Sequence, residues 1–85
     1  MSSLEEQFDA AAEKARSTQG VSNDNKLKIY SLFKQAKEGP VSKTNHQRPG
    51  MFDLTGKAKY DAWAGLGDMS KEQAMKDYIA LIDSL

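Results

Sequence analysis

Two pairs of a basic and an aromatic side chain at a spacing of four residues are candidates for binding chemistry, Tyr30 with Lys34 and Lys59 with Trp63. Residues four apart in a helix project side by side. An ammonium group neutralises a phosphate and an aromatic ring stacks on a nucleobase, so such pairs are typical of a polyphosphate site. Arg16 flanks a further apolar stripe. Ordinary surface lysines beside core aromatics would give the same pattern, and the residues alone leave both interpretations open.

Groups for catalysis, by contrast, are scarce. The one histidine, His46, has neither a carboxylate nor a nucleophile near it in the sequence, and we expect a solvated loop residue. Metal-ligand spacings such as HxxH and phosphate-binding glycine patterns such as GxGxxG do not occur. We therefore expect no catalysis, no metal site and no cofactor. The N-terminal carboxylates, which we expect to form a solvated surface, are Glu5, Glu6, Asp9 and Glu13.

The composition of the chain excludes several classes of function. The chain has 85 residues, of which 39% are hydrophobic, with 12 basic and 12 acidic side chains. This size predicts one domain, over residues 1–85, with a thin core. Zero net charge argues against a general nucleic-acid or anionic-membrane binder, and zero cysteines exclude disulfides and thiol chemistry. Because the N-terminal segment is acidic and no apolar run approaches about 20 residues, we expect a cytoplasmic monomer.

Apolar residues recur at helical spacing in four segments, and no segment alternates as a β-strand does. The pattern predicts an all-α, four-helix domain. Ser3 and Ser70 are each followed three residues later by Glu or Gln, which indicates capping boxes at two helix starts. Gly20 and the pair Gly39-Pro40 mark two helix ends. The expected helices cover about residues 4–16, 23–37, 55–66 and 71–85.

The second helix is expected to carry two faces, because its apolar residues fall on two separate arcs. The core face holds Ile29, Leu32, Phe33 and Ala36. The other face holds Leu27, Tyr30, Lys34 and Lys37. A helix with an aromatic and basic stripe beside its apolar stripe has a second role besides packing.

Other apolar residues are expected to serve the core. Trp63 lies at the edge of the apolar side of the third helix, where we expect it to pack. Tyr78 lies within a broad apolar arc of the fourth helix, so burial explains it as well as a ligand contact does. Met51 and Met75 are expected to fill gaps. The apolar side of the third helix consists of Leu54, Ala58, Ala62 and Leu66.

Residues 38–53 are rich in Gly, Pro, Ser, Thr and Asn, and are expected to form a loop. This loop is longer than most connections in a compact domain. Near its end, Pro49 fixes its own backbone and Gly50 permits a tight bend, so Arg48-Pro49-Gly50-Met51 is interpreted as a structural turn.

Four blocks of the chain, taken in order, resemble the acyl-CoA-binding protein family. They are YSLFKQA at 30–36, RPGM at 48–51, GKAKYDAW at 56–63 and AMKDYI at 74–79. The resemblance covers nearly the whole chain, from Phe8 to about Leu85. Each block alone would be weak evidence of the resemblance, but four blocks in the same order are highly specific to the family.

The resemblance implies an up-down-down-up four-helix bundle that binds long-chain acyl-CoA esters one-to-one as an intracellular carrier and pool former. It implies that Tyr30, Lys34 and Lys59 engage the 3′-phosphate of the ligand. Tyr78 would lie along the adenine and pantetheine part, and Arg16 near the headgroup. The alanines of the first helix would leave room for the acyl chain. The expected binding residues are Arg16, Tyr30, Ser31, Leu32, Phe33, Lys34, Lys59 and Tyr78, with Ala12, Leu27 and Thr55 as further candidates.

The sequence departs from the family at a few positions. Thr55 stands where a basic residue is common, Phe33 where many members have tyrosine, and Tyr60 where tryptophan is frequent. The expected partners are long-chain acyl-CoA and the enzymes that make or use it, without nucleic acid or stable membrane insertion. Two alternatives remain: a helical protein-interaction module that docks a partner on the Leu27–Tyr30–Lys34 face, and an acyl-CoA thioesterase, which the missing nucleophile–base pair disfavours.

Overall fold

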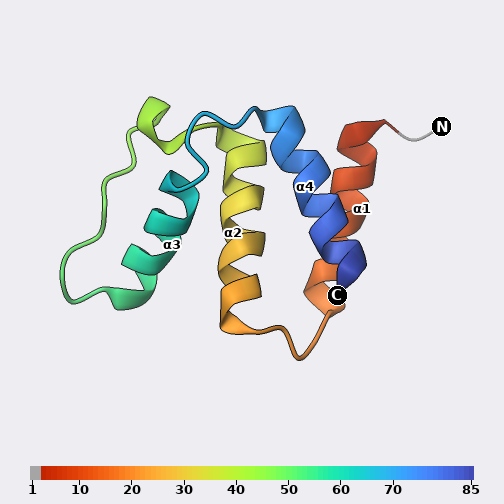
Figure 1. Cartoon of the computed structure of the whole chain (residues 1–85), viewed down its shortest axis with the longest axis horizontal. Coiled ribbons are helices and arrows are strands. Elements are labelled where there is room, and N and C mark those ends of the chain that lie inside the picture. Colours follow the sequence, from red (N-terminus) through yellow and green to blue (C-terminus); the bar gives the residue numbers. More distant parts are fainter. Residues whose placement is uncertain (1–2) are drawn as a thin grey trace.

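The computed structural model describes residues 3–85, and these form four α-helices and one short 3-10 helix without a strand. Figure 1 shows α1 and α4 running in one direction and α2 and α3 in the other. The expected all-α, up-down-down-up arrangement is therefore confirmed. The elements are α1 (Leu4–Ser17), α2 (Asn23–Glu38), η1 (Val41–Lys43), α3 (Leu54–Ala64) and α4 (Lys71–Ser84).

Each α-helix begins at a side-chain cap. The Ser3 hydroxyl accepts a hydrogen bond from the Glu6 backbone N–H at 3.1 Å, and Ser70 accepts one from Gln73 at 3.0 Å, as the sequence predicted. The other two caps, Ser22 and Asp53, were not predicted; they start α2 and α3 in the same way. Since a helix start leaves unpaired backbone N–H groups, these caps fix the helix boundaries locally.

Three aromatic rings form the centre of the core, where α1, α2 and α4 meet. The ring centres of Phe8 and Phe33 lie 5.6 Å apart, and Tyr78 lies 4.9 Å from Phe8. Phe8 and Tyr78 are only 1% and 2% exposed, which confirms the packing role expected for Tyr78. Met75 also packs against this core. The other buried residues of the cluster are Ala11, Leu32, Ala36, Ala74 and Ile82.

The helices do not pack as four equivalent columns. α4 packs against both α1 and α2, and α2 packs against α3. As a result α3 stands outside the group of the other three helices, as Figure 1 shows. Gln35, which is fully buried, donates from Nε2 to the carbonyls of Gly67 at 3.1 Å and Met69 at 2.7 Å and so ties α2 to the α3–α4 connection. This arrangement leaves α1 and α2 separated from each other on one side of α4.

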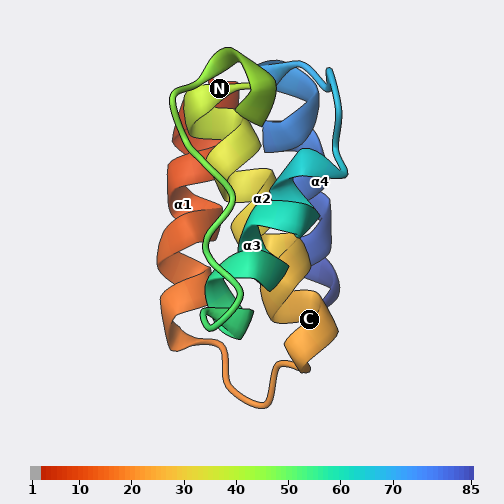
Figure 2. The ribbon, with the colours of Figure 1, turned by 90° about the vertical axis from the view of Figure 1, so that its left-hand side faces the viewer.

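The connection from α2 to α3 is held at several points. Figure 2 shows it running along α3. Val41 of η1 is buried, and the Trp63 indole N–H donates to the Gly39 carbonyl at 3.0 Å. Arg48 donates through Nε and one terminal nitrogen to the Asp61 carboxylate at 2.9 and 3.0 Å. Trp63 is 1% exposed, so its predicted packing role is confirmed, and the Arg48 turn serves structure.

The fold brings His46 next to residues that are distant from it in the sequence. Its ring stands edge-on to Trp63 with ring centres 5.1 Å apart, and its Nε2 lies 3.4 Å from Glu38 Oε1. His46 is an exposed loop residue, as expected, but the fold brings a carboxylate to it that the sequence did not indicate. The side chain remains 44% exposed, and the carboxylate comes from eight residues earlier because the connection folds back over the end of α2.

Two residues expected in the interior are exposed instead. Met51 is 70% exposed and Leu54 is 72% exposed. Leu54 is the first residue of α3, and side chains of a helix point toward its N-terminus, so this side chain lies at the exposed end of the helix. The predictions of Met51 as a core gap filler and of Leu54 as part of the buried side of α3 were wrong.

Candidate ligand-binding site

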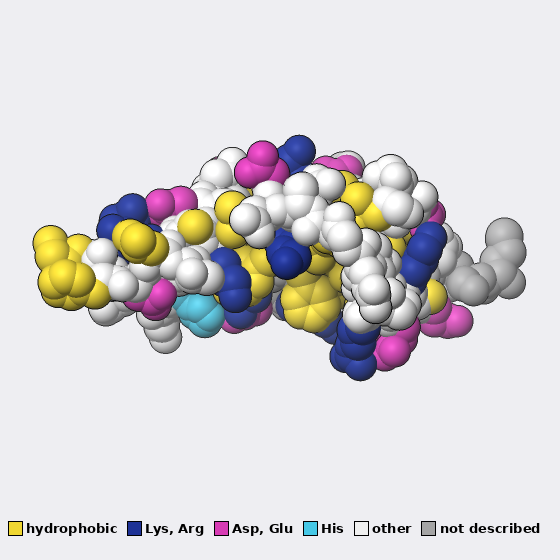
Figure 3. Space-filling model, turned by 90° about the horizontal axis from the view of Figure 1, so that it is seen from below, with side chains coloured by type: hydrophobic (Ala, Val, Ile, Leu, Met, Phe, Trp, Pro, Cys, Tyr) yellow, Lys and Arg dark blue, Asp and Glu magenta, His cyan; other side chains and the backbone are white. Residues whose placement is uncertain are grey.

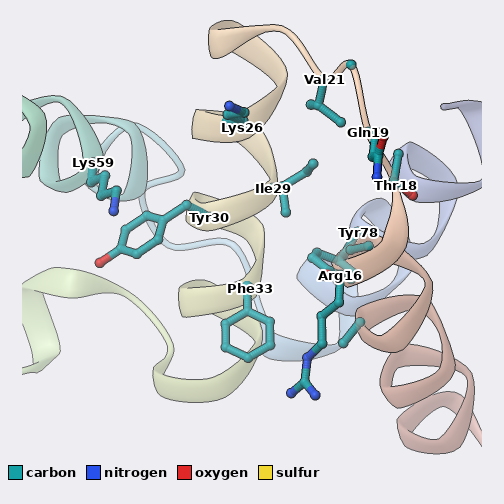
Figure 4. Close-up of a pocket in the computed structure, with 13 residues that line it drawn as sticks. Arg16, Thr18, Gln19, Val21, Lys26, Ile29, Tyr30, Phe33, Lys59 and Tyr78 are labelled. Carbon is teal, nitrogen blue, oxygen red and sulfur yellow. The ribbon is translucent and has the colours of Figure 1, made fainter.

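A cavity of about 810 Å³ opens between α1 and α2, in the space left by their separation. Figure 4 shows Ile29, Tyr30 and Phe33 projecting from α2, with Arg16 on the opposite wall. Ala12 and Ala15 of α1 line the same wall, and their small side chains leave the space that the sequence suggested. Tyr78 of α4 also lines this cavity. This cavity is therefore mostly apolar, with polar groups at its rim.

The α1–α2 connection covers one end of this cavity. Thr18, Gln19, Gly20 and Val21 all line it. Gly20 has a φ of 74°, a left-handed conformation that residues with a Cβ rarely adopt, so this glycine shapes the turn. The position of Gly20 as a stop beyond α1 agrees with the sequence prediction. Backbone groups of a short turn thus stand beside the apolar walls.

Tyr78 combines packing with a place in the cavity lining. Burial raises the pKa of its hydroxyl above the ordinary value, and the positive charge of Arg16 opposes this only in part. The phenol is therefore neutral over the physiological range, as a hydrogen-bonding group should be. Its ring remains locked between Phe8 and Phe33.

The rim of the cavity carries basic groups. The Lys59 ammonium lies 5.3 Å from the centre of the Tyr30 ring, which places a positive charge over an aromatic face. Arg16 is exposed and forms a 3.2 Å ion pair with Glu13, a contact that contributes little because both side chains are solvated. Lys26 lines the cavity and has no acidic partner among residues 3–85. These cations suit an anionic ligand with an aromatic part.

The Lys34 side chain lies beside the main cavity and is not part of its lining. Its ammonium forms an ion pair with Glu38 and lies 5.1 Å from the centre of the Trp63 ring. The sequence placed Lys34 beside Tyr30 and Lys59 beside Trp63. The structure exchanges these partners, since each lysine reaches across the α2–α3 interface to the ring of the other helix.

A second cavity of about 400 Å³ lies between the first turns of α2 and α3. Leu27, Leu54 and Ala58 supply its apolar surface, and Thr55 lines it as well. Lys26 and Lys59 line both cavities. The two cavities therefore adjoin at these two lysines, and we call the two together the extended site.

Residues 3–85 contain no group of three or more side chains that could hold a metal ion. None of the helices in the same range is long and apolar enough to cross a bilayer. His46 lines neither cavity.

Residues 5–82 match a protein-family model described as acyl CoA binding protein. The chain belongs to the acyl-CoA-binding protein family. An acyl-CoA-binding protein homolog from Manduca sexta is 50% identical over 84 residues, covering 98% of this chain and 91% of that protein. The crystal structure of Oryza sativa acyl-CoA-binding protein 2 superposes with a TM-score of 0.89 at 43% identity, covering 98% of this chain and 90% of that one.

The family also occurs within larger proteins. Human enoyl-CoA delta isomerase 2 is 52% identical over 63 residues, which are 74% of this chain but only 15% of that enzyme. The region of the isomerase that is similar to this acyl-CoA-binding protein family member is thus a small part of the enzyme. In contrast, the Manduca sexta and Oryza sativa relatives correspond to this chain over nearly their full length.

The structure brings together most, but not all, of the residues that the family resemblance suggested. The main cavity is lined by Ala12, Arg16, Tyr30, Phe33, Lys59 and Tyr78, and the second by Leu27, Thr55 and Lys59. Lys34 stands beside the site, and Ser31 and Leu32 lie buried outside both linings. Sequence reasoning missed Lys26, although its position four residues before Tyr30 places it on the same helix face.

Proposed function

We propose that this protein binds long-chain acyl-CoA esters one-to-one and non-covalently, as a cytoplasmic carrier and pool former, and catalyses no reaction. The observation that supports this best is the extended site, in which apolar walls end at a rim bearing Lys26, Lys59 and Tyr30. Such a site suits a ligand with an anionic nucleotide at one end and an aliphatic chain at the other. Membership of the acyl-CoA-binding protein family supports the same ligand.

The headgroup would bind at the rim. Coenzyme A carries about four negative charges, and a hydrogen bond to a charged group contributes about 1.5–3 kcal/mol. Lys59 and the Tyr30 hydroxyl would engage the 3′-phosphate, with Arg16 near the headgroup. Lys34 would join them by leaving Glu38, because the phosphate competes with that carboxylate for the ammonium group.

The acyl chain would lie in the apolar parts of the two cavities, shielded between the helices. Burial of methylene groups contributes up to about 0.8 kcal/mol each, so a chain of about sixteen carbons reaches a ceiling near 10 kcal/mol before ordering costs. The headgroup would therefore anchor the ligand, and the chain would set the discrimination between esters. Ala12 and Ala15, with their small side chains, keep the main cavity open for it.

Isothermal titration with palmitoyl-CoA, free coenzyme A and palmitate tests this function. We expect one molecule of palmitoyl-CoA bound per chain, and much weaker binding of the other two because each supplies half of the interaction. Chromatography of the mixture should recover the thioester intact. Equal affinity for palmitate and palmitoyl-CoA, or loss of the thioester over time, would contradict the proposal.

The alternative of a module that docks a partner helix has less support. The face that it would use, Leu27–Tyr30–Lys34, lies along the interface of α2 with α3. Lys59 covers the Tyr30 ring, and Leu27 shares the second cavity with α3 residues. α3 therefore already covers part of this face.

A further inference from the structure

Three exposed apolar side chains form one end of the molecule, at the start of α3. Met51 is 70% exposed, Phe52 94% and Leu54 72%. Figure 3 shows hydrophobic side chains gathered at an end of the long axis, where they protrude. We call Met51, Phe52 and Leu54 the apolar tip. A group of large apolar side chains that are this exposed marks a contact surface, because leaving them in water is unfavourable.

The surroundings of the apolar tip carry uncompensated positive charge. Residues 43–61 contain four basic and two acidic side chains, in a chain whose net charge is zero. Lys57 stands one helical turn after Leu54, and among residues 3–85 neither it nor Lys26 has an acidic partner within ion-pair distance. Lys59 contacts the Tyr30 ring.

Both acidic groups of this segment are already engaged. The Asp53 carboxylate accepts a hydrogen bond from the Gly56 backbone N–H at 2.9 Å as the cap of α3. The Asp61 carboxylate is held by Arg48. Arg48 balances the charge of Asp61, whereas Asp53 keeps its own negative charge. Four basic minus two acidic side chains still leave residues 43–61 with a net charge of +2, which complements an anionic surface.

The apolar tip is continuous with the extended site. Leu54 belongs to the tip and also lines the second cavity, together with Leu27 and Ala58. Leu54 thus joins the second cavity to the protruding end of the molecule. A surface that the tip contacts would adjoin this cavity, whose lining also carries Lys26 and Lys59.

We propose that the apolar tip contacts the interface of an anionic phospholipid bilayer, with Phe52 and Met51 among the acyl chains and the neighbouring lysines among the headgroups. A convex tip of three side chains offers a few hundred Å², roughly, which is small for a stable protein interface but sufficient for a reversible lipid contact. The contact itself is independent of the proposed function. Its use, the exchange of acyl-CoA at the bilayer through the second cavity, rests on that function.

Flotation with ligand-free protein tests the contact. The probes are vesicles of phosphatidylcholine alone and of phosphatidylcholine with phosphatidylserine, at low salt. We expect binding to the anionic vesicles, which weakens as salt rises, and weaker binding to the neutral ones. Phe52→Asp should reduce binding at least about tenfold, whereas the control Ala80→Asp, with the same charge change on the exposed face of α4, should reduce it much less.

A second variant reports on depth of contact. Phe52→Trp places an indole in the tip, and quenching by brominated lipids should be strong there and absent for Trp63 of the parent chain, which is buried. Titration with palmitoyl-CoA in solution should be unchanged in Phe52→Asp, because Phe52 lines neither cavity. This titration separates failure of the bilayer contact from failure of the proposed function.

Three results would overturn the proposal. The first is absence of binding to the anionic vesicles, which would indicate that the apolar tip contacts a protein partner instead of a bilayer. The second is an equal loss of binding in Phe52→Asp and Ala80→Asp. The third is a dimer in sedimentation velocity that Phe52→Asp abolishes, since this would assign the tip to a second copy of the chain.

Discussion

The ammonium nitrogen of Lys59 lies 5.3 Å from the centre of the Tyr30 ring, so a charge from α3 covers an aromatic face of α2 at the rim of the main cavity. Lys34 makes the complementary contact, 5.1 Å from the centre of the Trp63 ring. These two crossed contacts bridge α2 and α3. They also hold both ammonium groups near the site before any ligand is present, which reduces the ordering cost of binding.

Replacement of Lys59 should weaken the binding of palmitoyl-CoA without unfolding the protein. Lys59→Ala removes a charged donor at the rim, and we expect a loss of about 1.5–3 kcal/mol in titration. The loss should shrink with the 3′-dephospho form of the ligand, because the partner phosphate is then missing. Lys28→Ala, an exposed lysine of α2 that lines neither cavity, is the control and should bind normally.

Removal of one hydroxyl at Tyr30 should affect binding and spare stability. Tyr30→Phe keeps the ring that Lys59 covers, so urea unfolding should be nearly unchanged, while palmitoyl-CoA affinity falls by about 1 kcal/mol. Normal binding by Tyr30→Phe would contradict the headgroup role of this hydroxyl.

Truncation at Tyr78 should affect both properties. Tyr78→Ala empties the centre of the aromatic cluster, and we expect destabilisation of about 2–4 kcal/mol in urea melts, together with weaker binding. Tyr78→Phe retains the ring and should restore most of the stability, leaving only the effect on the ligand. If Tyr78→Ala unfolds as late as the parent, the ring does not serve the core.

Neutralisation of Glu38 should strengthen ligand binding. Glu38 holds Lys34 in an ion pair that a phosphate must break, so Glu38→Gln frees the ammonium group and should raise palmitoyl-CoA affinity by up to about 1 kcal/mol. Glu72→Gln, which breaks the 3.3 Å pair of Glu72 with Lys76 on α4, is the matched control and should leave affinity unchanged. Weaker binding by Glu38→Gln would show that the pair positions Lys34 for the ligand.

The coupling between Arg48 and Asp61 should depend on pH. The hydrogen bond from Arg48 lowers the pKa of Asp61 below its ordinary 3.8, so the folded state favours the ionised carboxylate. The pair therefore stabilises the fold above the ordinary pKa, and this contribution is lost as the pH falls through the lowered pKa. A double-mutant cycle with Arg48→Gln and Asp61→Asn should show coupling near neutral pH and none in strong acid. Coupling that persists in strong acid would exclude this ionic origin.

The helices could be predicted from the amino-acid sequence, because their signals are local. Apolar spacing and the caps Ser3 and Ser70 are read within one or two turns, and the expected helix boundaries agree with the structure to within about two residues. Tyr30 and Lys59 could also be named in advance, because their family motifs are contiguous blocks. Their positions at the cavity rim agree with that expectation.

Contacts between residues of different helices could not be predicted from the sequence, because they depend on how the helices pack. Four-residue spacing places Lys34 beside Tyr30 on one helix, but a long side chain turns to the ring that packing brings within reach, and that ring is Trp63 of α3. For the same reason His46 lies beside Glu38 and Trp63. Leu54 remains exposed although its spacing matches the half-buried Ala58 and Ala62. Periodicity defines a face of a helix; the packing of α1 and α2 on α4 determines whether that face meets a neighbour, a cavity or water.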